Sequence, residues 1–212
     1  MVEIIPSINA LTFAEVQEQI AKVEPYVSWC HLDVTDGVFS KHETWRNPQD
    51  LALLKAKLNA EVHLMVEEPE EILGQWLVEP IKRVIMHLEA MRDPDLVIRK
   101  CHEAGKEVGF AIRPDTPWSL LVPWCGKIDM ALILRVSPGA SGQAAASDML
   151  GEIRHIREAC PGCIVEIDGG VTIRNARKIS EAGAGLLVAG SAIFASGDIG
   201  GAISALRREA GV

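Results

Sequence analysis

Short apolar runs alternate along the chain with longer segments in which apolar side chains recur at every third or fourth position. The short runs have the length and the β-branched content of buried strands, and the longer segments have the period of amphipathic helices. We predict strands at residues 2–8, 27–33, 60–66, 83–87, 107–112, 130–136, 163–167 and 185–189. We predict helices at residues 13–23, 48–58, 69–77, 94–104, 118–121, 147–159, 173–182 and 199–208.

The order of the predicted elements indicates the fold. Strict alternation of strands and helices with short connections is typical of a parallel sheet covered by its crossover helices. Eight such units in 212 residues predict a compact α/β fold, the (β/α)8 TIM barrel. No Pro/Gly/Ser-rich linker divides the chain, and we therefore expect a single domain over residues 1–212.

Imidazole and carboxylate groups close several of the predicted strands. Alternation along a strand puts His31 and Asp33 on one face, and His63 and Asp168 each end an apolar run just before a turn. The carboxyl ends of barrel strands meet at one face of the molecule, so the four side chains are expected there together. Two nitrogen and two carboxylate donors suit one divalent metal ion (Zn, Fe(II), Mn or Co), and composition does not choose among these. Taken singly, each residue is also explained as a hydrogen-bonded core histidine or a helix-capping aspartate.

Turns that contain glycine follow three of the late strands. Their residues are Gly139, Ser141 and Gly142, then Gly169 and Gly170, then Gly190 and Ser191. Glycine lets the backbone approach a ligand closely and expose successive N–H donors. A phosphate site in the loops after strands seven and eight recurs in this fold, so the turns predict a phosphorylated ligand.

Other polar side chains at strand ends allow two interpretations. His87, Glu89 and Arg113 follow the fourth and fifth strands. They either belong to the functional site or are polar only because this end of the barrel meets water. The charged loop at residues 41–46 is either a lid over the substrate or a solvated subunit contact. The sequence leaves both questions open.

Composition and charge limit the class of protein. Hydrophobic residues make up 48% and charged residues 24% of the chain, as in soluble globular proteins. No apolar run reaches membrane-spanning length and the N-terminus lacks a signal-peptide pattern, so we expect a cytoplasmic protein without a membrane partner. A net charge of −8 argues against a nucleic-acid partner. The five scattered cysteines, including the CxxC pair Cys160 and Cys163, are expected to be reduced thiols.

Seven short motifs in this order carry a resemblance to a known family. They are PSI at 6–8, HLDVTDG at 31–37, VHLMVEEP at 62–69, MHLEA at 86–90, SPGASGQ at 137–143, VEIDGGV at 165–171 and VAGSAIF at 188–194. Taken together they resemble the ribulose-phosphate 3-epimerases. The resemblance implies a ribulose-phosphate-binding barrel and a metal-dependent isomerase of the pentose phosphate pathway. It further implies interconversion of D-ribulose 5-phosphate and D-xylulose 5-phosphate by a homo-oligomer.

The resemblance also implies roles for particular residues. The metal ligands would be His31, Asp33, His63 and Asp168, and Asp33 and Asp168 would also be the acid/base pair. The substrate, a small phosphorylated sugar, would contact Ser7, Met65, Gly139, Ser141, Gly142, Gly169, Gly170, Gly190 and Ser191.

The chain departs from the family pattern around the sugar. Thr35 and Leu134 stand where the family carries methionines, and the loop at residues 41–46 replaces a shorter segment. These differences change the shape of the pocket, so an epimerase of another ketose phosphate, such as allulose 6-phosphate, is an alternative. A keto-hexulose-phosphate decarboxylase or synthase is a second alternative. A non-catalytic sugar-phosphate-binding relative is a third, although both aspartates are present.

Overall fold

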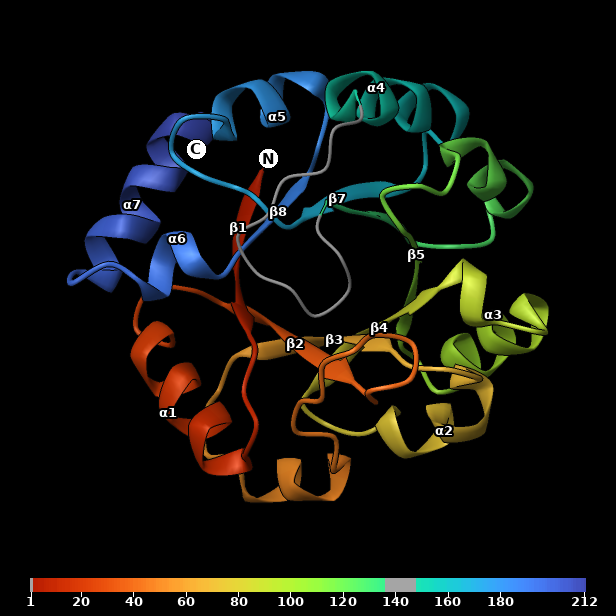
Figure 1. The fold of residues 1–212 in the computed structure, drawn as a ribbon, viewed down its shortest axis with the longest axis horizontal. Coiled ribbons are helices and arrows are strands. Elements are labelled where there is room, and N and C mark those ends of the chain that lie inside the picture. The colour runs from red at the N-terminus through yellow and green to blue at the C-terminus, as the bar shows by residue number, and fades with distance from the viewer. Residues whose placement is uncertain (1, 136–147) are drawn as a thin grey trace.

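The computed structural model describes residues 2–135 and 148–212. Its eight parallel strands are hydrogen-bonded in chain order, and β8 pairs again with β1, so that the sheet closes into a barrel. The helices form a ring around this barrel (Figure 1). The predicted (β/α)8 TIM barrel is confirmed.

Element bounds agree with the predicted strands to within a few residues. The strands are β1 (Glu3–Ile8), β2 (Trp29–Thr35), β3 (Asn59–Met65), β4 (Ile81–His87), β5 (Glu107–Ile112), β6 (Met130–Leu134), β7 (Ile164–Asp168) and β8 (Leu186–Ala189). The α-helices are α1 (Phe13–Val23), α2 (Pro69–Trp76), α3 (Pro94–Glu103), α4 (Met149–Ala159), α5 (Ala176–Ala182), α6 (Ser191–Phe194) and α7 (Ile199–Ala210). Short 3-10 helices are η1 (Pro48–Leu53), η2 (Leu88–Ala90) and η3 (Trp118–Trp124).

Local sequence explains why α1 starts and packs as it does. Thr12 accepts a hydrogen bond from the backbone of Glu15, and the Glu15 carboxylate accepts one from the backbone of Thr12, which forms a capping box. Val16, Ile20 and Val23 then recur on one face and are buried against the barrel.

Alternation within the strands builds two cores. Outward-facing residues such as Cys30, Leu32 and Val34 of β2 join the large apolar core under the helices. Inside the barrel, an apolar cluster contains Ile5, Ile85, Ala111, Met130, Leu132, Leu134, Leu186 and Val188. The buried ionisable residues on β2, β3, β4 and β7 are His31, Asp33, Glu61, His63, Arg83, His87, Glu166 and Asp168. Buried polar groups need partners, so this part of the interior must form a network.

Two predicted helices are wrong in type or length. The helix expected at residues 48–58 is the 3-10 helix η1, which stops at Leu53. Beyond it, the Lys57 N–H donates to the Glu24 side chain at 2.8 Å, so this backbone is drawn toward α1 instead of bonding within a helix. The helix expected at residues 118–121 is η3, where Pro123 lacks the N–H that a regular helix requires.

A third predicted helix begins late. The helix expected at residues 173–182 starts at Ala176, because Asn175 Oδ1 accepts the Thr172 N–H at 2.8 Å and closes a turn first. Gly183 then ends α5 with a left-handed backbone at φ +114°.

The cysteines differ from the expected reduced state. A disulfide joins Cys125, just after η3, to Cys160 at the end of α4, while Cys30, Cys101 and Cys163 are free and buried. Cys160 therefore pairs with a residue distant in sequence and not with Cys163 of the CxxC motif. Only the fold brings these two segments together.

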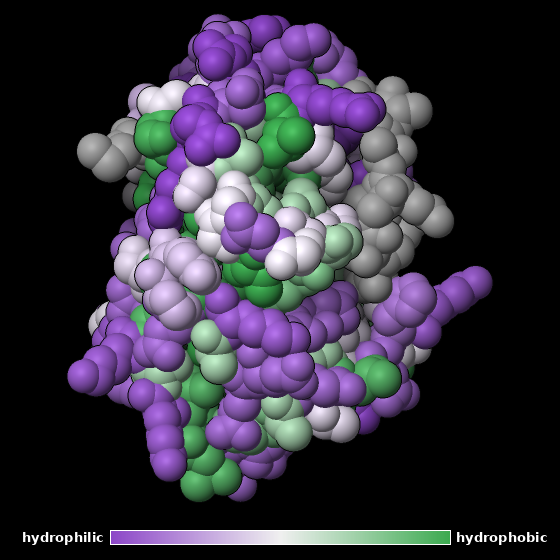
Figure 2. All heavy atoms as spheres, turned by 90° about the vertical axis from the view of Figure 1, so that its left-hand side faces the viewer, coloured by the Kyte–Doolittle hydropathy of each residue, from purple (hydrophilic) through white to green (hydrophobic). Residues whose placement is uncertain are grey.

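The outer surface is largely hydrophilic where the molecule is viewed from the side of α1, α6 and α7, with separate hydrophobic spots (Figure 2). None of the helices within residues 2–135 and 148–212 combines the length and apolar character needed to cross a bilayer.

Candidate metal centre and active site

The four predicted metal ligands come together at the carboxyl ends of three strands. β2 supplies His31 and Asp33, β3 supplies His63 in register with Asp33, and β7 supplies Asp168. One donor atom from each residue lies within 4.8 Å of the others, and all four residues are buried. Strand alternation and barrel closure together therefore produce the donor set that the sequence predicted.

The donor atoms of the four residues face one another at short distances. His31 Nε2 lies 3.3 Å from His63 Nδ1 and 3.3 Å from Asp33 Oδ1, and His63 Nδ1 lies 3.5 Å from Asp168 Oδ2. Asp33 Oδ1 is buried, yet no residue in the described part of the chain gives it a well-aligned hydrogen bond. An orphaned carboxylate oxygen facing two imidazole nitrogens fits a divalent cation.

The pKa values at this site reflect competition between burial and charge. Burial alone would lower the pKa of His31, but the neighbouring carboxylates of Asp33 and Glu61 raise it well above its ordinary value. Burial would likewise lower the pKa of His63, but the carboxylates of Asp168 and Asp33 raise it. For Asp33, burial would raise the pKa, but the two imidazoles lower it. A cation bound here would take the place of protons held by the imidazoles.

A layer of charge beneath the cluster was missed in the sequence. Glu61 Oε1 lies 2.7 Å from His31 Nδ1, and Glu61 Oε2 accepts a 2.6 Å hydrogen bond from Arg83. Burial and the neighbouring Glu61 raise the pKa of Glu166 well above its ordinary value. The available signal was spacing, because Glu61 and Glu166 each stand two residues before a predicted ligand and share its strand face.

The His63 ring also has a partner on its other side. His63 Nε2 lies 3.0 Å from His87 Nε2, and His87 Nδ1 lies 3.2 Å from Glu89 Oε2. Burial lowers the pKa of His87 to about 4, so this imidazole is neutral near pH 7. Of the two interpretations given to His87, contact with the site is the one that the fold supports.

The predicted substrate residues divide into three groups. Ser7 Oγ donates to Asp33 Oδ2 at 2.6 Å, and Ser7 lines a hollow of about 310 Å³ together with Gly190, Ser191 and Lys22. Other predicted residues lie elsewhere at this end: Gly169 and Gly170 have φ of +96° and +70° directly after β7, and Met65 is buried against Phe39 and Ala90. Gly139, Ser141 and Gly142 lie outside the described residues.

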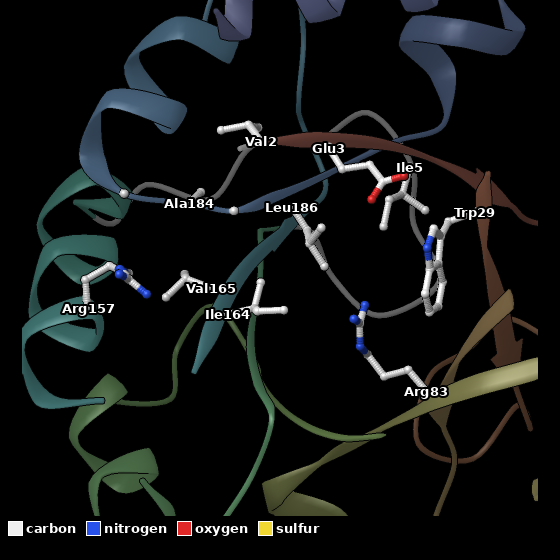
Figure 3. A pocket seen from close by; sticks show the side chains of 12 residues that line it. Val2, Glu3, Ile5, Trp29, Arg83, Arg157, Ile164, Val165, Ala184 and Leu186 are labelled. Carbon is white, nitrogen blue, oxygen red and sulfur yellow. The ribbon is translucent and has the colours of Figure 1, made fainter. Parts of the chain in front are cut away.

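A larger cavity of about 440 Å³ lies at the opposite end of the barrel (Figure 3). Its walls include Glu3, Trp29, Ile164 and Leu186, which begin their strands, together with Arg83. Chemistry in these barrels is performed at the carboxyl ends of the strands, so this cavity is not the candidate active site.

Comparison with known proteins identifies the family. The matching family model is described as the ribulose-phosphate 3 epimerase family and covers residues 3–194. The ribulose-phosphate 3-epimerase of Schizosaccharomyces pombe is 32% identical over 212 residues, covering 98% of this chain and 93% of the relative. That of Mycobacterium leprae is 33% identical over 213 residues, covering 98% and 95%.

Solved structures share the fold at much lower identity. The 3-hexulose-6-phosphate synthase from Salmonella typhimurium has a TM-score of 0.76 at 14% identity, covering 99% of this chain and 98% of that one. The 3-keto-L-gulonate-6-phosphate decarboxylase from Vibrio cholerae has a TM-score of 0.75 at 13% identity, covering 99% and 97%. These identities bear on the fold alone, whereas the family model and the curated relatives match most of the sequence. The chain therefore belongs to the ribulose-phosphate 3-epimerase family and is a ribulose-phosphate 3-epimerase-like isomerase.

Proposed function

We propose that this protein inverts C3 of a ketose phosphate and interconverts D-ribulose 5-phosphate and D-xylulose 5-phosphate, with one divalent metal ion as cofactor. The observation that carries the proposal is the placement of Asp33 on β2 and Asp168 on β7 in one donor cluster. Two strands, β1 and β8, separate β2 from β7 around the barrel. The two carboxylates therefore reach a ligand from different walls.

Inversion at C3 needs proton transfer on both faces of that carbon. The ionised aspartate takes the C3 proton, and the electrons of the C–H bond form a C2–C3 double bond while the C2 oxygen becomes negative. The protonated aspartate gives its proton to the opposite face of C3, and the electrons return to the carbonyl. The pair ends with its protonation states exchanged. Ser7 orients the Asp33 carboxylate for this role through its hydrogen bond.

The metal ion would be held by His31, Asp33, His63 and Asp168. When bound, a divalent cation stabilises the negative charge that develops on the substrate oxygens. The mixed nitrogen and carboxylate donors suit Zn, Fe(II), Mn or Co. A second possible donor group contains Glu61, which is already paired with Arg83, so the cation is assigned to the first group.

The substrate phosphate is assigned to the hollow beside Ser7. Gly190 and Ser191 supply backbone there, and Lys22, which pairs with Glu18 at 2.7 Å, also lines the wall. Gly169 and Gly170 are proposed to contribute from the turn after β7. Gly139, Ser141 and Gly142 are proposed to complete the phosphate site, as the family resemblance implies.

The wider setting is proposed on the same basis. The protein would act in the pentose phosphate pathway, in the cytoplasm and as a homo-oligomer. Its partner would be a small phosphorylated sugar, with no nucleic acid and no membrane. The net charge of −8 supports the exclusion of nucleic acid.

Proton NMR in heavy water tests this function directly. Metal-loaded protein is mixed with D-ribulose 5-phosphate, and the C3 proton signal and the appearance of D-xylulose 5-phosphate are followed together. Loss of the C3 proton with appearance of the epimer is the expected result. Metal-loaded protein that gives neither change would contradict the proposal.

A second candidate substrate is a longer ketose phosphate such as allulose 6-phosphate. Thr35 Oγ1 is buried and, within the described residues, has no hydrogen-bond partner. Thr35 pairs in register with Met65, two steps beyond the Asp33 and His63 pair. A sugar with an additional hydroxyl would satisfy this oxygen, and a panel of ketose phosphates in the same NMR assay compares the substrates.

Removing one imidazole should lower the metal content of the protein. His63→Ala deletes a proposed ligand, and we expect metal affinity to fall by at least about 100-fold, more than loss of a group outside the ligand set costs. The control is His102→Ala, an exposed histidine on α3 that pairs with Asp129. Metal analysis after dialysis measures the content, and wild-type stoichiometry in His63→Ala would remove this residue from the site.

A further inference from the structure

A histidine that binds a metal must present a lone pair, so its other ring nitrogen has to carry the proton. For His63 the nitrogen that faces the cluster is Nδ1, at 3.5 Å from Asp168 Oδ2 and 3.7 Å from Asp33 Oδ1. Metal binding through Nδ1 therefore requires a proton on Nε2. The side chain behind His63 decides how readily this tautomer forms.

That side chain is His87, which by itself does not determine which of the two rings donates the hydrogen bond between them. The two Nε2 atoms of His63 and His87 lie 3.0 Å apart, and the two rings are stacked with planes 20° apart. A proton between them can belong to either ring. His87 accepts from His63 only if its own proton is on Nδ1.

Glu89 determines which nitrogen of His87 carries the proton. Its Oε2 lies 3.2 Å from His87 Nδ1, and a carboxylate only accepts hydrogen bonds. Its Oε1 accepts from the Arg113 backbone N–H at 2.8 Å and from the Thr116 hydroxyl, which hold the carboxylate in place. The His87 proton is therefore on Nδ1, and His87 Nε2 is an acceptor.

The same group of residues is closed by the loop after β2. The Phe39 ring packs on His87 with centroids 4.7 Å apart, and the Arg113 guanidinium lies 3.9 Å from the Phe39 ring centre. Arg113 also donates to the Phe39 carbonyl at 3.1 Å. This packing covers His87, which has no exposed surface, and keeps its hydrogen bonds away from competing water.

We propose that Glu89 and His87 are positioning residues that fix His63 as the Nε2–H tautomer, so that its Nδ1 is available to the metal. The inference rests on the proposed metal centre and extends it from β3 to the loops after β4 and β5. His31 is held differently, because its Nδ1 meets the Glu61 carboxylate directly at 2.7 Å. The two histidine ligands are thus oriented by two separate carboxylates.

The substitution Glu89→Gln tests whether the Glu89 carboxylate sets the tautomers of His87 and His63. The amide that replaces the carboxylate can turn its NH2 toward His87 Nδ1, which favours the opposite tautomers of His87 and His63. We expect the dissociation constant for Zn²⁺ to rise about 10- to 100-fold, as for other residues that support a metal ligand. The matched control Glu209→Gln changes a half-exposed carboxylate on α7 that pairs with Arg177 of α5 outside the barrel, and less than about 3-fold change is expected.

Two measurements separate positioning from a general structural effect. Competition with a chromophoric chelator gives Zn²⁺ affinity, and urea unfolding of the metal-free variants shows whether Glu89→Gln still folds with near wild-type stability. Two-bond ¹H–¹⁵N spectra of the zinc-loaded wild type report which nitrogen of His63 carries the proton. A proton on Nε2 of His63, together with weakened zinc binding by folded Glu89→Gln, is the expected result.

Three outcomes overturn the inference: zinc on Nε2 of His63, wild-type zinc affinity in Glu89→Gln, or a wild-type protein that binds no zinc. Neither the zinc titration nor the spectrum involves a sugar. A protein that has the expected His63 tautomer but leaves the C3 proton untouched would therefore contradict the proposed function. It would not contradict the inference about Glu89 and His87.

Discussion

Asp168→Asn and Asp33→Asn should each slow the interconversion of D-ribulose 5-phosphate and D-xylulose 5-phosphate by about 10²- to 10⁴-fold. An amide neither takes nor returns a proton near neutral pH, so one face of C3 loses its acid/base group in each variant. Both aspartates are buried in the donor cluster, where bulk water is a poor substitute.

The two variants should also differ from each other in a way that exposes the pair. The aspartate that remains can still remove the proton from one epimer and return deuterium to the same face. Residual exchange without inversion is therefore expected with one epimer for Asp33→Asn and with the other epimer for Asp168→Asn. Proton NMR in heavy water, started from each epimer, measures both rates.

Metal content must be measured in the same samples, because both aspartates are also proposed ligands. The control is Asp95→Asn, which changes an exposed aspartate paired with Lys127 on the outside of the barrel. A metal-loaded Asp33→Asn or Asp168→Asn protein that interconverts the epimers at the wild-type rate would show that the acid/base assignment is wrong.

Arg83→Met should destabilise the folded protein by about 3–5 kcal/mol, the cost expected when one partner of a buried ion pair is removed. Arg83 donates to Glu61 and Glu107, each at 2.6 Å, and its guanidinium lies 4.9 Å from the Trp29 ring centre. Figure 3 shows Arg83 and Trp29 at the wall of the cavity that lies opposite the candidate active site. Glu61 has no exposed surface, so without Arg83 it loses its guanidinium partner inside the protein. Glu166 lies beside it as a second buried carboxyl group.

Lys82→Met is the matched control, because Lys82 is the neighbour of Arg83 on β4 and pairs with Glu79 at the surface. Exposed ion pairs contribute little, so a change of less than about 1 kcal/mol is expected. Urea unfolding of both variants measures the free energies of unfolding. Similar small changes in the two variants would mean that the Arg83 ion pairs do not stabilise the barrel.

The amino-acid sequence predicted the parts of this protein that depend on local spacing. Period-two alternation predicted His31 and Asp33 on one face of β2 and Cys30 and Leu32 on the other, and in the structure the first pair faces into the barrel and the second pair outward. The order of strands and helices predicted the barrel, and barrel closure brought His63 and Asp168 to the same cluster. The motifs at the strand ends indicated the family that the comparisons then confirmed.

Local pattern failed where a distant group competes for the backbone. The helix expected at residues 48–58 stops at Leu53, and the Lys57 N–H bonds to Glu24 at the end of α1, which no spacing within the segment indicates. The disulfide between Cys125 and Cys160 depends in the same way on how η3 and α4 lie in the ring of helices.

The tertiary structure alone decided which polar groups meet inside the barrel. The contacts of Glu61 with His31 and of His87 with His63 cross between strands, so they depend on strand register and on where the barrel closes. A residue's side of a strand follows from its neighbours in sequence, because side chains alternate along the backbone. Its partner follows from the position of another strand, and this is why the sequence predicted the four residues of the donor cluster while only the fold showed which side chains contact them.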